Sequence, residues 1–338
     1  MNIGWGVAGV LAGGLLNGSF VAPMKWMSKW RWENSWLVYS VAGLLVIPWL
    51  TAFATVPHLL SIFLQSSTSV LVKVLLFGLG WGIGSVLFGL GVNRLGLAVG
   101  YGIILGLIAP IGTFLPLLVL HPERLGTRQG HVLMAGTALV LAGIVFLALA
   151  GKCREKKCAI LAPMVQTGFL AGFIICVFAG IFSPMLNFSF VFGQELQQKA
   201  LLSGTEIGMA SNAIWCLTLT AGFLVNFGYC IFLLRKNNTW RLFTGATVSS
   251  GHWFGAVAMG FLCFGSFLVY GMGATRLGSL GGIVGWPLFM SMSLITSNGL
   301  GALTGEWKGA GTRSYSYSVA GLALLIAAIV VISRQSST

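Results

Sequence analysis

The sequence is short of charge, and of negative charge above all. It contains no aspartate, and charged residues make up 7% of its 338 residues, whereas soluble domains carry roughly 25%. This shortage excludes a soluble globular domain. It also argues against an enzyme, because the chain offers no HExxH motif and no histidine pair at helical spacing for chemistry inside a bilayer. No metal site and no cofactor are expected, beyond a co-transported proton.

Long apolar segments are what the sequence does have. It is 57% hydrophobic, with a mean hydropathy of +0.92 and 48 glycines. A membrane helix needs about 20 residues to cross ~30 Å of hydrocarbon, and glycine lets such helices pack closely. The sequence predicts an all-α polytopic membrane protein with ten transmembrane helices, at 2–23, a segment ending near 55, 70–91, 97–120, 131–150, 163–187, 209–234, 247–271, 278–303 and 316–332.

A duplicated corner divides the chain into two halves. Five residues of one polar corner recur at a constant offset of 182 residues. The pairs are Gly89 and Gly271, Gly91 and Gly273, Arg94 and Arg276, Leu95 and Leu277, and Gly96 and Gly278. Because five helices separate the copies, equivalent helices cross the membrane in opposite directions. We therefore expect two inverted five-helix repeats, 1–158 and 159–338, an arrangement that suits alternating access in secondary transporters.

The positive charge indicates membrane topology. The net charge is +13, but the basic residues are scattered between apolar segments, so nucleic-acid binding is not expected. The loops after odd-numbered helices hold 13 of the 19 Lys and Arg residues, which places those loops in the cytoplasm. We expect a multi-pass protein of the plasma (inner) membrane, embedded in lipid, with both termini outside. Because one chain holds both repeats, it can work as a monomer.

Several motifs resemble a known family. They are Val21-Ala22-Pro23-Met24-Lys25, Lys29-Trp30-Arg31-Trp32-Glu33, Trp81-Gly82-Ile83-Gly84, the corner from Gly89 to Gly96, Asn226-Phe227-Gly228-Tyr229-Cys230 and Glu306-Trp307-Lys308. With them the chain resembles the L-rhamnose–proton symporter family within the drug/metabolite transporter superfamily. The resemblance implies proton-coupled uptake of a small neutral sugar. An exporter of drugs or amino acids, or an importer of another small metabolite, from the same superfamily is the alternative.

A neutral sugar needs amides, hydroxyls and flat aromatic rings at its binding site, because it presents hydroxyls and apolar ring faces. Residue types inside the predicted helices suggest five candidates for substrate binding: Asn17, Trp81, Tyr101, Trp286 and Asn298. Tryptophan in mid-helix also serves helix packing, and a buried asparagine also serves hydrogen bonding between helices. Both alternatives stay open from the sequence alone.

The proton carrier is harder to find, because no predicted helix has an acid near its centre. A histidine titrates near pH 6.5, and His252 lies inside a predicted helix. Glu33, with Lys25, at the cytoplasmic mouth is the second candidate. The alternatives are a neutral His252 that bonds neighbouring helices, and Glu33 and Lys25 as an interfacial anchor or salt bridge.

Overall fold

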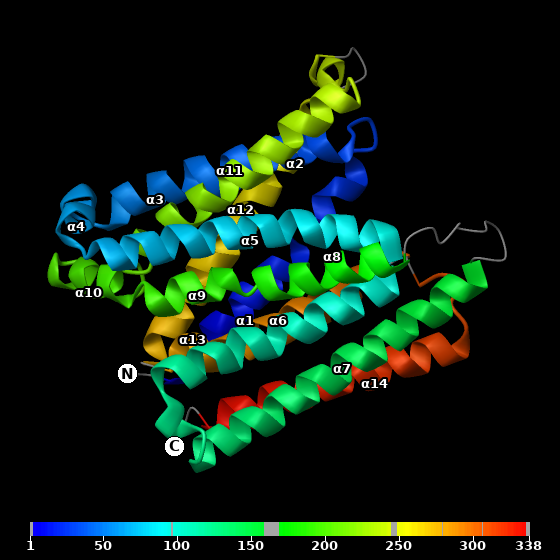
Figure 1. The fold of residues 1–338 in the computed structure, drawn as a ribbon. Helices are drawn as coiled ribbons and strands as arrows, with labels where there is room; N and C mark the ends of the chain where they lie inside the picture. Colours follow the sequence, from blue (N-terminus) through cyan, green and yellow to red (C-terminus); the bar gives the residue numbers. More distant parts are fainter. Residues whose placement is uncertain are drawn as a thin grey trace.

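The computed structural model describes residues 3–95, 97–158, 169–244, 249–278, 280–305 and 307–335. Over these ranges the chain is a bundle of helices without strands (Figure 1). The first half holds α1 (Ile3–Ser19), η1 (Ala22–Trp26), α2 (Trp32–Ser40), η2 (Val41–Val46), α3 (Ile47–Thr55), α4 (Leu59–Gln65), α5 (Thr68–Leu95), α6 (Leu97–Leu120), η3 (Pro122–Arg124) and α7 (Arg128–Cys158). The second half holds α8 (Phe169–Phe182), α9 (Met185–Phe192), α10 (Gln194–Leu202), α11 (Asn212–Lys236), η5 (Trp240–Phe243), α12 (Ser250–Arg276), α13 (Gly281–Leu303) and α14 (Thr312–Gln335).

Nine helical segments in the described ranges are long and apolar enough to cross a membrane. They match nine of the ten predicted segments. The tenth, α13, has 23 residues but is not among the nine, because its second half is rich in hydroxyls and an amide. Ser291, Ser293, Thr296, Ser297 and Asn298 lower its hydropathy, and three of them line the cavities described below.

Two short helices lie where the predicted membrane helices leave only connections, after residue 55 and after residue 187. They are α4 and α10, and they pack against each other. Each short helix buries apolar residues on one side, such as Leu59 and Ile62 of α4 and Leu196 and Ala200 of α10. In both segments the apolar residues of one helix face are interspersed with polar residues, so the average hydropathy of the segment does not indicate a helix.

Prolines interrupt two segments that the sequence predicted as continuous. The helix expected over 2–23 ends at Ser19, and a separate 3₁₀ turn, η1, follows at Pro23. The helix expected over 163–187 contains a break at Ser183-Pro184 between α8 and α9, and its first residues, 163–168, lie outside the described ranges. Proline lacks an amide hydrogen and clashes with the preceding turn, so breaks at these positions follow from its chemistry.

Glycines set the closest helix contacts. A Cβ added to Gly13 of α1 would lie 2.8 Å from the carbonyl oxygen of Ser266 on α12. Gly43 lies in η2, a π-helical turn, and a Cβ there would lie 2.6 Å from the Cα of Gly260 on α12. Backbone therefore meets backbone at these crossings, which is how helices associate in lipid without a hydrophobic driving force.

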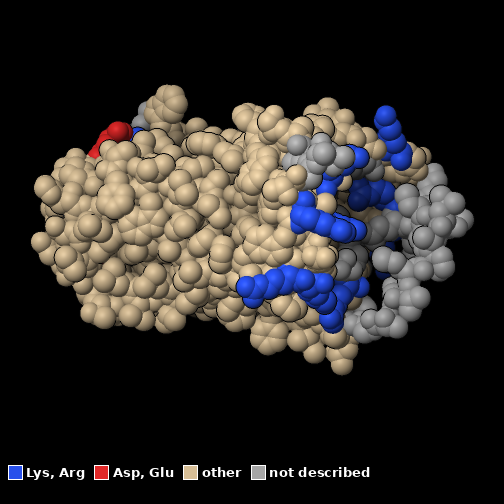
Figure 2. Space-filling view, turned by 90° about the horizontal axis from the view of Figure 1, so that it is seen from above, with Lys and Arg blue, Asp and Glu red and all other residues tan. Residues whose placement is uncertain are grey.

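The two ends of the bundle differ in charge. The N- and C-termini lie at one end, which we call the terminus end (Figure 1). Lys and Arg side chains gather at the opposite end, which we call the basic end (Figure 2). At the terminus end several cations are paired with glutamates, as in Lys199–Glu195 at 3.0 Å and Arg276–Glu206 at 3.8 Å.

Candidate functional site: a cavity between the two halves

A cavity of about 270 Å³ lies where helices of both halves meet. We call it the central cavity. Its walls come from α1, α2, α5 and α6 in the first half, and from α12, α13 and the α8–α9 break in the second. A second hollow of about 220 Å³, the vestibule, shares Gly18, Val21 and Leu294 with it and extends to Lys25 and Arg154 at the basic end. Together they form a path from mid-bundle towards the basic end.

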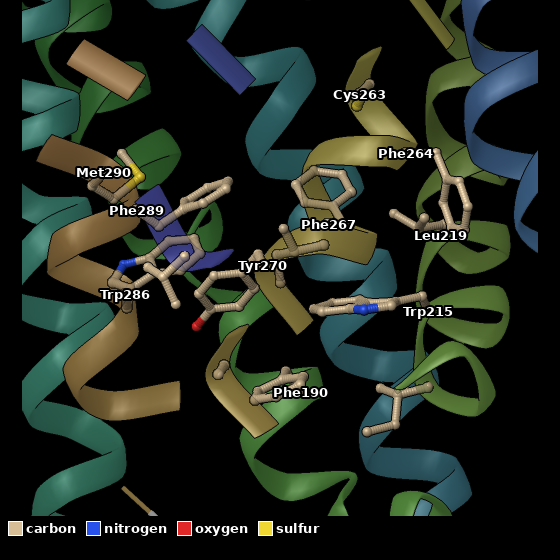
Figure 3. Packing of buried hydrophobic residues seen from close by; sticks show 14 of the residues in the cluster. Phe190, Trp215, Leu219, Cys263, Phe264, Phe267, Tyr270, Trp286, Phe289 and Met290 are labelled. Atoms are coloured by element: carbon tan, nitrogen blue, oxygen red, sulfur yellow. The ribbon is translucent and has the colours of Figure 1, made fainter. Parts of the chain in front are cut away.

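Aromatic rings form much of the wall of the central cavity. Trp81 of α5 meets Phe267 of α12 edge to face, with ring centroids 5.9 Å apart and planes at 89°. Trp286 and Phe289 of α13 stack at 5.8 Å and 22°, and both lie beside Tyr270 (Figure 3). Flat rings of this kind can pack against the apolar face of a small ring-shaped ligand.

Uncharged polar groups complete the wall. Asn17 of α1 donates from Nδ2 to Ser293 Oγ of α13 at 3.1 Å, and Ser85, Ser183 and Ser297 also line the central cavity. Among its described lining residues there is no acid, lysine, arginine or histidine. The cavity therefore suits a neutral polar ligand better than an ion.

A buried hydrogen-bond cluster joins helices on the terminus side of the cavity. Asn187 of α9 donates from Nδ2 to the carbonyl oxygens of Gly112 on α6 and Gly282 on α13, both at 3.0 Å. Its Oδ1 accepts from the Tyr270 hydroxyl of α12 at 2.7 Å. We call these groups the Asn187 cluster. It ties four helices from both halves together at a fully buried point.

The structure brings most of the predicted substrate residues to one place. Asn17, Trp81 and Trp286 line the central cavity, and Asn298 lines the vestibule. The side chain of Tyr101 lies outside the described part of α6. Trp286 was expected near the middle of its helix, but it lies in the second turn of α13, which runs from Gly281 to Leu303.

The predicted proton residues lie apart from the central cavity. Lys25 lines the vestibule and hydrogen-bonds Thr304. Glu33 lies in the first turn of α2, is 4% exposed, and accepts from Asn237 Nδ2 at 2.9 Å and Thr239 Oγ1 at 2.8 Å.

His252 occupies the first turn of α12 and is 7% exposed. Its Nδ1 lies 3.2 Å from Ser249 Oγ, and its Nε2 has no partner among the described residues. The ring packs against Trp30, with centroids 5.7 Å apart. Neither His252 nor Glu33 touches the central cavity, so a proton on either would act on the ligand through the intervening helices.

Sequence reasoning missed part of the wall. Trp36, Tyr39 and Ser85 line the central cavity, and none of them is among the predicted substrate residues. The available signal was spacing, because Trp36 and Tyr39 are three residues apart and share a helix face. They form an edge-to-face pair at 4.9 Å.

An apolar helix bundle with an uncharged, aromatic-lined cavity between its halves is typical of a membrane carrier for small molecules. The chain belongs to the L-rhamnose-proton symport protein (RhaT) family, whose model matches residues 1–336. Curated relatives agree. The L-rhamnose-proton symporter of Cronobacter sakazakii is 27% identical over 98% of both chains. That of Escherichia coli is 25% identical over 93% of this chain and 92% of its own, and that of Salmonella typhi is 26% identical over the same shares.

Proposed function

We propose that this protein takes up L-rhamnose together with a proton, by alternating access of the central cavity to the two sides of the membrane. Family membership supports this function, and the relatives are named as L-rhamnose-proton symporters. The observation that carries the proposal is the chemistry of the cavity wall. Stacked aromatic rings and uncharged amides and hydroxyls suit the ring faces and hydroxyls of a neutral sugar.

Helix packing supports an inverted repeat within the drug/metabolite transporter superfamily. α1 of the first half packs on α12 and α13 of the second, and α8 and α9 of the second half pack on α5 and α6 of the first. The two sets correspond if α1 is equivalent to α8–α9, α5 to α12 and α6 to α13. The constant offset of the glycine corner pairs α5 with α12 in the same way. α7 and α14, the last helices of the two halves, pack along each other.

The orientation follows from charge. We propose that the basic end faces the cytoplasm and that the termini face outwards in the inner membrane, because basic loops stay on the cytoplasmic side. The vestibule reaches the basic end, which under this orientation supports a state that faces the cytoplasm. In this state Asn17, Trp81, Trp286 and Asn298 are positioned to meet the sugar between the cavity and its exit.

For the proton we propose His252 or Glu33 as the carrier, with Lys25 at the exit. His252 is supported by burial and by an Nε2 atom without a partner among the described residues. Glu33 is supported by its burial and by the two side chains that donate hydrogen bonds to it, Asn237 and Thr239. Protonation of either group would change its hydrogen bonds to the ends of α11 or α12, which pack beside α2.

The direct test is uptake of radiolabelled L-rhamnose into proteoliposomes, with and without an inward proton gradient. Accumulation that rises with the gradient and collapses with a protonophore is the expected result. A gradient-driven response to another sugar would keep the mechanism and reject the substrate. If no sugar accumulates in either condition, the symport proposal is wrong and export of another metabolite becomes the hypothesis to test.

A further inference from the structure

Asn226 of α11 sits directly behind the cavity wall. Its side chain is buried, with 1% exposed, and it does not line the central cavity. Its Oδ1 accepts two hydrogen bonds, from Trp36 Nε1 at 2.9 Å and from Ser85 Oγ at 3.0 Å. Its Nδ2 donates to the Gly222 carbonyl at 2.9 Å. One amide oxygen therefore holds two cavity residues that come from different helices, α2 and α5.

The donors of these two residues are directed away from the cavity. Trp36 has a single N–H, and Asn226 takes it, so the indole can offer a ligand only its ring. The Ser85 hydroxyl has one hydrogen, which it directs to Asn226 Oδ1 or to the Gly82 carbonyl at 2.9 Å. Its oxygen is left as an acceptor towards the cavity.

We propose that Asn226 is a positioning residue for sugar binding, which fixes Trp36 as an apolar face and Ser85 as a hydrogen-bond acceptor. This inference rests on the proposed function. It assigns the sugar a hydroxyl that donates to Ser85, with an apolar ring face beside Trp36. The gain in binding free energy comes from preorganisation, because the Trp36 and Ser85 rotamers are fixed before the sugar binds.

The effect of Asn226 extends through the aromatic wall. Trp36 stacks on Trp32 with centroids 4.8 Å apart and planes at 20°, and it contacts Tyr39 at 4.9 Å and Phe20 at 6.3 Å. Loss of the Asn226 hydrogen bond frees the indole to rotate within this group. A single substitution outside the cavity should therefore weaken ligand binding.

The test compares Asn226→Leu with Asn212→Leu in the proteoliposome uptake assay. Asn212 is an equally buried amide on α11, 1% exposed, whose Nδ2 bonds Thr55 Oγ1 away from the cavity. Wild-type uptake is measured first, so that absence of rhamnose transport refutes the proposed function and not this inference. For Asn226→Leu we expect KM to rise about tenfold, because one or two hydrogen bonds that position the wall are lost. The maximal rate should stay within about twofold of the wild-type rate. Asn212→Leu should leave KM unchanged.

Rescue separates positioning from packing. Asn226→Asp is isosteric; in its protonated form it can accept from Trp36 and Ser85 and still donate to Gly222, so its KM should return close to wild type. If Asn226→Leu does not fold, Asn226→Ser replaces it, because the shorter side chain fits the space but cannot reach Trp36. An unchanged KM in the folded Leu or Ser variant, or an equal rise in Asn212→Leu, would overturn the inference.

Discussion

At the scale of single residues, Trp81 offers a direct test of the cavity wall. It is a half-buried indole at the middle of α5, and its edge-to-face pair with Phe267 borders the central cavity. Trp81→Leu removes an aromatic surface worth about 1 kcal/mol beyond its buried area. We expect KM for L-rhamnose to rise between about fivefold and tenfold, measured by initial uptake rates in proteoliposomes.

The matched control for Trp81 is Trp5, a tryptophan of α1 with 69% of its surface exposed. Trp5→Leu should leave KM unchanged, because this ring lies outside the cavity. Equal KM values for Trp81→Leu and wild type would remove Trp81 from the binding site.

The proton carrier is also a residue-scale question. Substitution of the carrier, by Glu33→Gln or by His252→Gln, should abolish gradient-driven accumulation, because the side chain can no longer bind and release a proton. Exchange of labelled for unlabelled sugar across the membrane should continue, since it needs no net proton movement. Accumulation and exchange are measured on the same liposomes.

His121 provides the control for the histidine change. It lies in the loop after α6 at the terminus end, 3.5 Å from Glu123, so His121→Gln should leave accumulation intact. If Glu33→Gln and His252→Gln both accumulate rhamnose like the wild type, neither residue is the carrier.

Residue type alone located part of the site, and geometry located the rest. Asn17, Trp81 and Trp286 could be selected because amides and indoles inside apolar helices need a reason to be there. Trp36 could not be selected in this way, because a tryptophan that follows Lys29 and Arg31 closely in the sequence is equally typical of a membrane interface. Asn226 has the same residue type as Asn17, and only the fold shows that it faces the back of the wall.

At the scale of helices, the Gly43–Gly260 crossing should be sensitive to a single methyl group. A Cβ on Gly43 would lie 2.6 Å from the Gly260 Cα and 2.8 Å from its carbonyl oxygen, so backbone has to move. We expect Gly43→Ala to lower the free energy of unfolding by about 1–3 kcal/mol, the usual cost of overpacking. Thermal unfolding in detergent measures the change.

Gly228 on α11 is the control for this crossing. A Cβ added there has no atom within 4 Å, so Gly228→Ala should unfold at the wild-type temperature or slightly above it, since alanine favours helix. A Gly43→Ala protein as stable as Gly228→Ala would contradict the close approach of η2 and α12.

The sequence predicts where most helices lie, but it does not predict every point at which a helix is interrupted. Runs of apolar residues such as 70–91 and 97–120 correspond to α5 and α6, because lipid requires continuous apolar helices of this length. The turn at Pro23 and the break at Pro184 depend on local backbone chemistry that hydropathy averages out. α4 and α10 are short, and their apolar faces have meaning only through their contact with each other.

At the scale of the whole molecule, the proposed orientation predicts which loops a membrane-impermeant thiol reagent can reach. Gly126 lies in the exposed loop between α6 and α7 at the terminus end, and Arg235 is exposed at the basic end of α11. In intact cells Gly126→Cys should be labelled and Arg235→Cys should not. After lysis, both should be labelled.

The six native cysteines set the background of this experiment. Cys176, Cys216, Cys230 and Cys263 are buried, and Cys153 and Cys158 lie at the basic end of α7. The unmodified protein, labelled in intact cells and after lysis, gives the background for each condition. Labelling of Arg235→Cys before lysis, with Gly126→Cys protected, would invert the proposed orientation.

The Asn187 cluster makes the two faces of this carrier unequal. At the offset of 182 residues, Tyr270 corresponds to Phe88, which lines the cavity and has no hydroxyl to donate. Opening towards the termini should break buried hydrogen bonds, each worth about 0.5–1.5 kcal/mol net, whereas a phenylalanine side chain cannot donate the bond that the Tyr270 hydroxyl donates. Under the proposed orientation, the protein should therefore favour the state that is open to the cell interior. Its outward reset, and not the release of sugar, would then limit the rate of each cycle.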